Sequence, residues 1–413
     1  MTKKTSQNNL LIFLTFLLLV VNYKFFYLFP IGSFGARTNE LLFSTLSILS
    51  FIIIFNKIRG YNYLFSNFII ILFLFFLIEV FYTIFKYPEP PMDAVKEFIP
   101  YLSLLSYLTF SSLAQVDLKR FLKIIIVLGT IIAFICILEL FLHTHNFELF
   151  KIYGFNYGLT SDQLNDQTYL IRNGRSRLIG SDLIDFTGVI SIGCLFNKEK
   201  YLSKKLLSLN IILVLFYEYY ISQTRSTFMC LIFIAIVLVI IKYGKRLNTG
   251  ITIGTLIITV PIVMTFAIRK IFTIQNNGTE YSTYHRIDEI NYYLSIFKEK
   301  PIFGNGFLKD KPLYMEDYIL IHGDNIYAGN AYSDVGLVGS IAKYGIFGLL
   351  LLIMLVIKEF IIIKRNKSLL LIALFIMTLL SMIDLSFLDA ERLPSLCIYM
   401  AIFDGIAKSK KGV

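Results

Sequence analysis

Residues 63–86 read YLFSNFIIILFLFFLIEVFYTIFK, a stretch in which one acid, Glu79, stands among apolar side chains. About 20 consecutive apolar residues are enough for an α-helix to cross the hydrocarbon core of a bilayer. Every backbone polar group needs an internal partner there, so such a block must be helical. The stretch therefore predicts a membrane-spanning helix.

Similar apolar blocks recur along the whole chain, which is 56% hydrophobic and only 16% charged. A soluble domain of this composition could not cover its surface with polar groups. The fold class that we predict is an all-α polytopic membrane protein of about 12 transmembrane helices. The predicted spans lie at 10–29, 38–56, 63–86, 98–115, 121–142, 183–197, 206–222, 226–242, 249–268, 335–361, 368–387 and 392–407.

Lysine and arginine alternate between the two sides of these spans. One set of connections holds most of them, including Lys119, Arg120 and the run from Lys198 to Lys205. The positive-inside rule places this set and both termini in the cytoplasm. Because the net charge of +11 resides mostly in these short loops, it does not indicate a nucleic-acid partner. The first apolar block, Leu10–Phe29, lacks a small-residue cleavage site and is predicted to be a span, not a signal peptide.

Two long segments remain on the outer side, and we expect them to carry the function, as long loops on one side of a bundle usually do. The predicted division is 1–142 for spans one to five, 143–182 for the first long extracytoplasmic loop, 183–268 for spans six to nine, 269–334 for the second long extracytoplasmic loop and 335–413 for the last three spans.

Several ionisable residues lie in the outer portions of the predicted spans. The acids are Glu79, Glu139, Asp185, Glu218 and Asp384. A charge that faces lipid is costly, so together they predict a polar cavity that opens outward. The alternative is that each residue reaches the interface on its own. Lys24 and Lys343 are candidate partners for these acids.

The first long loop contains a cluster of arginines, Arg172, Arg175 and Arg177, within YLIRNGRSRLIGSDLIDFTG (169–188). Arginine offers a planar fork of donors that fits phosphate oxygens in pairs, so the cluster suits a lipid diphosphate. The alternative is contact with anionic lipid headgroups.

Two further arginines stand on the outer side. Arg225 lies in SQTRSTF (222–228), a tight turn between two predicted spans, seven residues after Glu218. The two residues would share a helix face if the helix continued that far. The alternative role for Arg225 is a simple ion pair with Glu218 that holds the hairpin. Arg286 is the third residue of YHRIDEINYYLSIFKEKPIFGNGF (284–307), where residues 284–297 fit an amphipathic interfacial helix. Pro301 ends that helix and two glycines predict a turn.

The second long loop closes with IHGDNIYAGNAYSDVGLVGSIAKYGIFG (321–348), which offers His322, Asp324 and Asp334. A helix N-cap is the alternative role for Asp334. The glycines after it, Gly339, Gly345 and Gly348, predict close helix contacts. The histidines lack metal-ligand spacing and the four cysteines lie in apolar segments, so neither a metal site nor a disulfide is predicted.

Together these segments resemble the Wzy-type O-antigen and capsule repeat-unit polymerases of the O-antigen polymerase and ligase superfamily. The resemblance runs from about Leu159 to Gly348, and Arg177 with Gly188 fits an Arg-x10-Gly pattern of a polymerase loop. Ligases of the superfamily carry the pattern His-[Asn/Ser/Gln]-x9-Gly-x-x-Gly at the end of the large loop. Here the two glycines match at 345 and 348, but the leading pair is Asp334-Val335, which favours a polymerase.

The resemblance implies a GT-C-like glycosyltransferase of the bacterial inner membrane that acts on undecaprenyl-diphosphate-linked glycans. Membrane lipids surround such an enzyme, and a chain-length regulator and a flippase are its expected partners. An attacking sugar hydroxyl needs a base, and the departing diphosphate needs fixed positive charge. The candidate bases are Asp334, Asp324 and His322, and the candidate cations are Arg177, Arg225, Arg286, Arg172 and Arg175. Since arginines can supply the charge, we expect neither metal nor cofactor, and direct displacement would invert the anomeric centre.

Three alternatives remain open at this point. A ligase that moves finished polymer onto a lipid acceptor belongs to the same class. A lipid-linked oligosaccharide flippase would carry charges through the full depth of the bundle, whereas these acids cluster outward. A structural scaffold would not need the arginine cluster.

Overall fold

The computed structural model describes most of the helical part of the chain. The described residues are 2–25, 36–55, 60–88, 90–143, 145, 171–172, 175–176, 178, 181–243, 290–308, 320–322, 325–327, 332–384 and 386–409. Both long predicted loops and the predicted span 249–268 therefore lie largely or wholly outside them.

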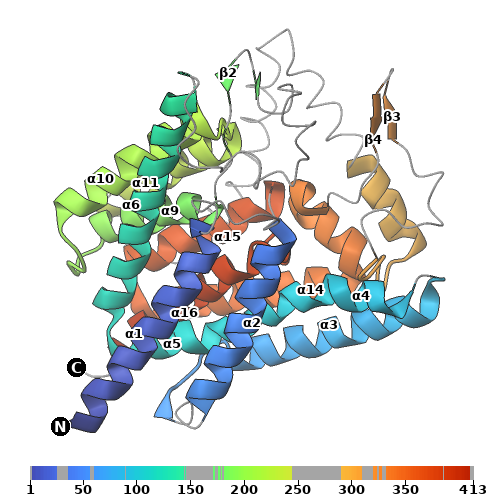
Figure 1. The fold of residues 1–413 in the computed structure, drawn as a ribbon, viewed down its shortest axis with the longest axis horizontal. Coiled ribbons are helices and arrows are strands. Elements are labelled where there is room, and N and C mark those ends of the chain that lie inside the picture. Colours follow the sequence, from blue (N-terminus) through green and yellow to red (C-terminus); the bar gives the residue numbers. More distant parts are fainter. Residues whose placement is uncertain are drawn as a thin grey trace.

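Helices dominate the described residues (Figure 1). They are α1 (Thr2–Asn22), α2 (Ala36–Ile54), α3 (Ser66–Lys86), α4 (Pro91–Phe98), the 3-10 helix η3 (Ile99–Leu105), α5 (Ser106–Val116), α6 (Leu118–His143), α9 (Leu183–Phe196), α10 (Lys204–Phe216), the π turn η5 (Tyr217–Ile221), α11 (Arg225–Tyr243), a helix over 290–299, the 3-10 helix η6 (Tyr332–Val335), α14 (Gly336–Asn366), α15 (Leu369–Asp384) and α16 (Leu393–Ser409). Two antiparallel hairpins accompany them: β1 (Ile171–Arg172) pairs with β2 (Arg175–Ser176), and β3 (Leu320–His322) with β4 (Asn325–Tyr327).

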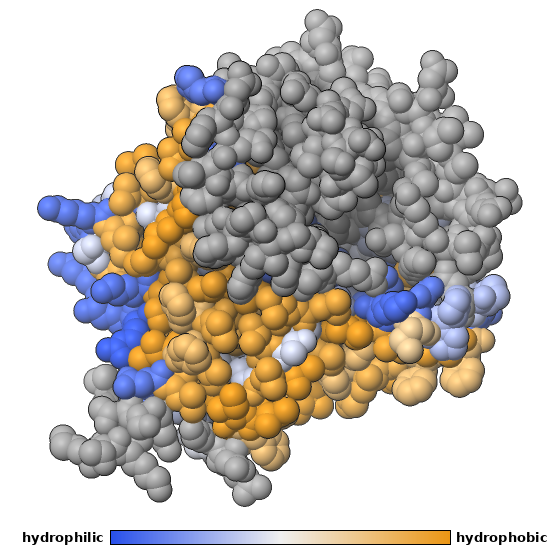
Figure 2. Space-filling model, in the orientation of Figure 1, coloured by the Kyte–Doolittle hydropathy of each residue, from blue (hydrophilic) through white to orange (hydrophobic). Residues whose placement is uncertain are grey.

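The helices have the length and surface of membrane spans. Four of those described, within α3, α6, α11 and α14, are long and apolar enough to cross a bilayer, and four shorter ones are also apolar. On α3 the exposed residues Ile70, Leu74, Ile78, Phe81 and Phe85 recur every three or four positions as one apolar stripe. Figure 2 shows such residues merging into a broad apolar surface, with hydrophilic residues at its left edge. A helical membrane protein, as predicted, accounts for this surface.

The core is built around α15 and α16. Every residue of α16 from Leu393 to Ile406 is buried, because α5 covers it on one side and other helices surround it. A helix that is apolar on all sides is stable only in such a position. Its one acid, Asp404, accepts hydrogen bonds from Tyr107 Oη at 2.6 Å, Ser111 Oγ at 2.5 Å and Leu64 N at 3.1 Å. These donors satisfy a buried carboxylate at the end of the bundle near the termini.

Helical segments occupy all the predicted spans that fall on described residues. The fourth span, 98–115, is irregular: η3 precedes α5, with Pro100 at the start of the 3-10 helix. The predicted amphipathic helix is seen over 290–299, and a turn follows at 301–305 as predicted from Pro301 and the glycines. The total of 12 spans and the five-part division remain predictions. All four cysteines are buried and free, as predicted.

The two ends of the bundle differ. The first helix starts and the last helix ends on one side, near the loop between α9 and α10 that carries Lys198, Lys200, Lys204 and Lys205. Both hairpins lie on the other side (Figure 1). This basic connection and the two hairpins of the long loops are thus at opposite ends.

Candidate functional site

Several helices meet at the hairpin end of the bundle. There α1 ends, α2, α9 and α16 begin, and a turn over residues 386–392 joins α15 to α16. This 386–392 turn contains Asp389, Glu391 and Arg392, all charged, between two apolar helices. It contacts two polar regions, one beside α9 and one beside α14.

Beside α9, Arg392 forms a buried ion pair. Only 7% of Arg392 is exposed. Its Nε lies 3.1 Å from Asp182 Oδ2, and a terminal guanidinium nitrogen lies 3.9 Å from Asp389 Oδ2. Asp182 is the last residue before α9, where the predicted first long loop ends. The guanidinium therefore ties the end of that loop to the 386–392 turn.

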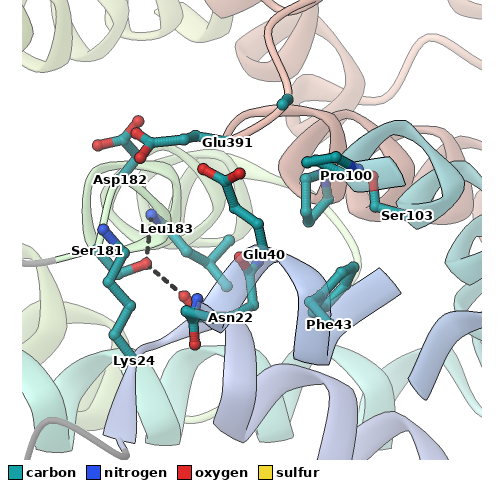
Figure 3. A pocket seen from close by; sticks show the side chains of 13 residues that line it. Asn22, Lys24, Glu40, Phe43, Pro100, Ser103, Ser181, Asp182, Leu183 and Glu391 are labelled. Carbon is teal, nitrogen blue, oxygen red and sulfur yellow. Dashed lines mark hydrogen bonds between the residues drawn. The ribbon is translucent and has the colours of Figure 1, made fainter. Parts of the chain in front are cut away.

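A polar pocket opens next to this ion pair (Figure 3). It occupies about 480 Å³, its open mouth included. Its walls come from the end of α1, the start of α2, the start of η3, the start of α9 and the 386–392 turn. We refer to it as the α1–α9 pocket. None of the span acids that predicted a polar cavity and whose side chains are described lines it, and its own acids are Glu40, Asp182 and Glu391.

Beside α14, Lys343 lies among aromatic rings. Its ammonium donates a hydrogen bond to Tyr101 Oη at 2.8 Å. The rings around it, with the ammonium 5.3 to 5.8 Å from their centroids, are those of Tyr101, Phe307, Tyr332 and Tyr344. Lys343 does not form the expected ion pair with any described acid inside a span. The carboxyl oxygens of Glu79, one such acid, are both buried without a hydrogen bond. Cation–π attraction stabilises the ammonium instead.

The start of α14 is interlocked with the turn after the helix over 290–299. Gly345 has φ +60° and breaks the helical hydrogen-bond ladder. The carbonyl groups of Ala342 and Lys343 accept bonds from Asn305 N at 2.9 Å and Gly306 N at 2.7 Å. We call residues 301–308 with this kink the 301–308 junction. As predicted, Gly345 allows a close backbone contact, although its partner is the 301–305 turn and not a helix: a Cβ there would lie 2.1 Å from Ile302 O.

The junction also pairs its polar side chains. Asn305 Nδ2 donates to Tyr332 Oη at 2.8 Å, and its Oδ1 accepts from Lys300 Nζ at 2.9 Å. Phe307 N donates to Thr83 Oγ1 at 2.9 Å on α3. The segment FGNGF is therefore held by hydrogen bonds from three directions.

Glu218 does not share a helix face with Arg225. The π turn η5 ends α10, and residues 222–224 separate it from α11, which Arg225 begins. Glu218 accepts hydrogen bonds from Ser222 Oγ at 2.9 Å and from Thr224 Oγ1. Its other carboxyl oxygen, Oε1, is buried without a hydrogen-bond partner.

The residues predicted to carry the chemistry lie mostly outside the described residues. Arg177, Arg286 and Asp324 do so entirely, as do the side chains of Arg225, His322, Asp334 and Asp384. Arg172 and Arg175 are described by their backbones, which pair directly across the β1–β2 hairpin. The N-cap of α14 is Val335, so the alternative role of Asp334 as the cap does not hold.

Residues not singled out in the sequence complete the polar layer. None of the predicted site residues is among them: they are Asp182, Asp389, Glu391, Glu40 and Arg392. A sequence signal did exist. FLDAERLP (387–394) places three charged residues in the short connection between two apolar helices. One of them, Arg392, is only 7% exposed in the structure.

Comparison with known proteins gives one match. Residues 211–353 match the family model described as O-Antigen ligase, which is about a third of the chain. No curated protein matches the sequence. The match confirms the resemblance to the O-antigen polymerase and ligase superfamily. It runs from α10 into α14 and includes the second long loop, the 301–308 junction and Lys343.

Proposed function

We propose that this chain, which carries an O-antigen ligase family domain at residues 211–353, polymerises lipid-linked oligosaccharide repeat units. The growing glycan leaves its undecaprenyl diphosphate and is joined to the end sugar of another lipid-linked unit. The observation that carries the proposal is the family match over the second long loop. The pair Asp334-Val335, where ligases have a histidine, favours polymerase over ligase.

The reaction needs a base and a cluster of cations, and the loops offer both. Asp334, with Asp324 and His322 behind it, is the proposed base for the attacking hydroxyl. Arg177, Arg225 and Arg286 are proposed to stabilise the diphosphate as it leaves, with Arg172 and Arg175 beside them. Attack and departure on opposite sides of the anomeric carbon invert its configuration. No metal is required, since guanidinium groups can carry the charge.

The register of the first hairpin supports an anionic ligand there. Arg172 and Arg175 are direct cross-strand partners in β1 and β2. Like charges opposite each other destabilise an antiparallel pair. A phosphate group between two guanidinium groups removes that repulsion and gains charge-assisted hydrogen bonds. This supports the proposed diphosphate site in the first loop.

The proposed setting is the bacterial inner membrane, with about 12 spans in a GT-C-like arrangement. The basic connections at the end that carries both chain ends support cytoplasmic termini. The two hairpins at the other end then face outward, where lipid-linked units arrive from a flippase. A chain-length regulator would act at the same face.

Arginine substitution tests the proposal in cells that lack the native gene. We expect Arg177→Ala and Arg286→Ala to abolish polymer while the protein remains inserted in the membrane. Arg120→Ala is the control, because Arg120 is 53% exposed and sits at the end with the basic connections. Full-length polymer from both loop variants, seen as an electrophoretic ladder, would refute the assignment of the cations.

The family description favours one second candidate, a ligase that transfers finished polymer to a lipid acceptor. The two reactions differ in product: a polymerase lengthens the glycan in the absence of any other acceptor, and a ligase does not. Supplying purified protein with lipid-linked repeat units alone separates them.

A further inference from the structure

We infer that the α1–α9 pocket binds a sugar residue of the glycan, as a subsite separate from the cations that hold the diphosphate. This inference rests on the proposed function for the identity of the glycan. The pocket lies at the hairpin end of the bundle, to which both long loops belong. The polar side chains in its lining that matter here are those of Asn22, Lys24, Glu40, Ser103, Asp182 and Glu391.

Two hydrogen-bond donors in this lining have no partner. Asn22 is 8% exposed and Ser103 is 2% exposed. Asn22 Nδ2 and Ser103 Oγ are both fully buried atoms that make no hydrogen bond. Buried polar groups are paired in the great majority of cases, so unpaired ones in a pocket wall indicate a ligand that pairs them. Sugar hydroxyl groups can accept from both donors.

Acceptors gather on one side of the same pocket. Figure 3 shows the carboxylates of Glu40, Asp182 and Glu391 close together, while Pro100 and Ser103 lie at the opposite side. A carboxylate accepts from neighbouring hydroxyl groups with both of its oxygens. A ring with hydroxyls on several carbons can thus donate to this side and accept from Asn22 and Ser103.

The charge of the lining argues against the diphosphate as the occupant. Three carboxylates face one ammonium, Lys24, and the buried Arg392 is already paired with Asp182. An anionic ligand there would meet the like charge of these carboxylates in a partly desolvated site, which is unfavourable. A neutral, hydroxyl-rich group meets no such penalty. The pocket therefore fits a sugar, and the phosphates belong at the arginines of the loops.

The remaining walls suit the same ligand. Phe43, Leu183 and Pro394 are apolar and buried, and they offer surface for the C–H faces of a pyranose ring. Lys24 holds a left-handed backbone with φ 57°, a conformation that is unfavourable outside glycine and is concentrated at functional sites. That backbone brings Lys24 into the lining directly after α1 ends.

The test compares two pocket variants with a matched control. Ser103→Ala and Asn22→Leu each remove one unpaired donor from the lining. Thr15→Val is the control, since Thr15 Oγ1 on α1 is also buried and unpaired but does not line the pocket. The probe is the free repeat-unit oligosaccharide, released by mild acid from the lipid-linked pool of the host bacterium. Its binding to protein in nanodiscs is measured by saturation-transfer NMR, and KM and kcat are measured with the lipid-linked form.

We expect Kd and KM to rise about five- to tenfold in both pocket variants, the effect of losing one hydrogen bond, with kcat nearly unchanged. Thr15→Val should bind like the wild type, and inorganic pyrophosphate should not displace the oligosaccharide. Unchanged Kd and KM in both variants, with polymer still formed, would overturn the subsite and leave the polymerase intact. Displacement by pyrophosphate would overturn it also. Oligosaccharide binding that depends on Asn22 and Ser103 without any polymer would instead refute the proposed reaction.

Discussion

The 301–308 junction and the α1–α9 pocket lie at the same end of the bundle and use their polar groups in opposite ways. In the junction Asn305 pairs both atoms of its amide, with Tyr332 and Lys300. In the pocket the amide nitrogen of Asn22 is also buried, and it makes no hydrogen bond. The difference separates a polar region that holds the fold together from one whose hydrogen-bonding capacity is left for a ligand.

The strongest way to break the junction is at its kink. A Cβ on Gly345 would lie 2.1 Å from Ile302 O, and its φ of +60° is itself unfavourable for other residues. Gly345→Ala should therefore lower the free energy of unfolding by about 3 kcal/mol or more. The chain has no tryptophan, but a thiol-reactive dye that reports exposure of its four buried cysteines follows unfolding on heating.

Gly60→Ala is the matched control for that experiment. Nothing lies within 4 Å of a Cβ built at Gly60, so the melting curve should stay close to that of the wild type. Equal melting temperatures for the Gly345 and Gly60 variants would show that the kink is not under this constraint.

A smaller effect is expected at the ion pair between the pocket and the 386–392 turn. Arg392→Ala leaves Asp182 and Asp389 without their cation, and these carboxylates are 30% and 22% exposed, so water compensates in part. We expect a loss of about 2 kcal/mol, below the value for a fully buried pair. Arg120→Ala, which removes an exposed pair with Asp117, should change stability by less than about 1 kcal/mol in the same dye assay. If the two arginine variants melt alike, the buried pair does not anchor the turn.

The smallest effect is expected at Asn22, in a direct comparison of the two asparagines. Asn305→Leu removes two hydrogen bonds, one accepted by Tyr332 Oη and one donated by the part-buried Lys300 Nζ, which should cost about 1–3 kcal/mol. Asn22→Leu removes an amide nitrogen without a partner and should change stability by no more than about 0.5 kcal/mol. A large loss of stability in Asn22→Leu in the absence of glycan would mean that the polar groups of the pocket hold the fold together, as those of the 301–308 junction do.

Sequence patterns predicted the helices well because each span must satisfy its own backbone. The length and apolar composition of runs such as 63–86 and 335–361 were enough to predict a helix in each. The helices α3 and α14 lie where these runs predicted them. Pro301 and the glycines at 304 and 306 predicted a turn from local chemistry alone, and the turn is there.

The partners of buried polar groups could not be predicted in the same way. Lys343 donates to Tyr101, 242 positions away, instead of pairing with a span acid. The turn predicted between the spans at 206–222 and 226–242 is there, so Glu218 and Arg225 do not share a helix face, and Ser222 and Thr224 bond to the Glu218 carboxyl instead. Arg392 meets Asp182 across the bundle. Such choices depend on which helix ends meet, and spacing along one helix carries no information about that.

The central claim is that this protein joins lipid-linked repeat units to one another at the hairpin end of its bundle. The direct measurement supplies purified protein in nanodiscs with lipid-linked repeat units and no other acceptor, and resolves the products by electrophoresis. The account predicts a ladder of glycans that differ by one repeat unit, and its loss in Arg177→Ala. Single repeat units that remain unextended by the wild-type protein, or that are transferred only when a separate lipid acceptor is added, would contradict it.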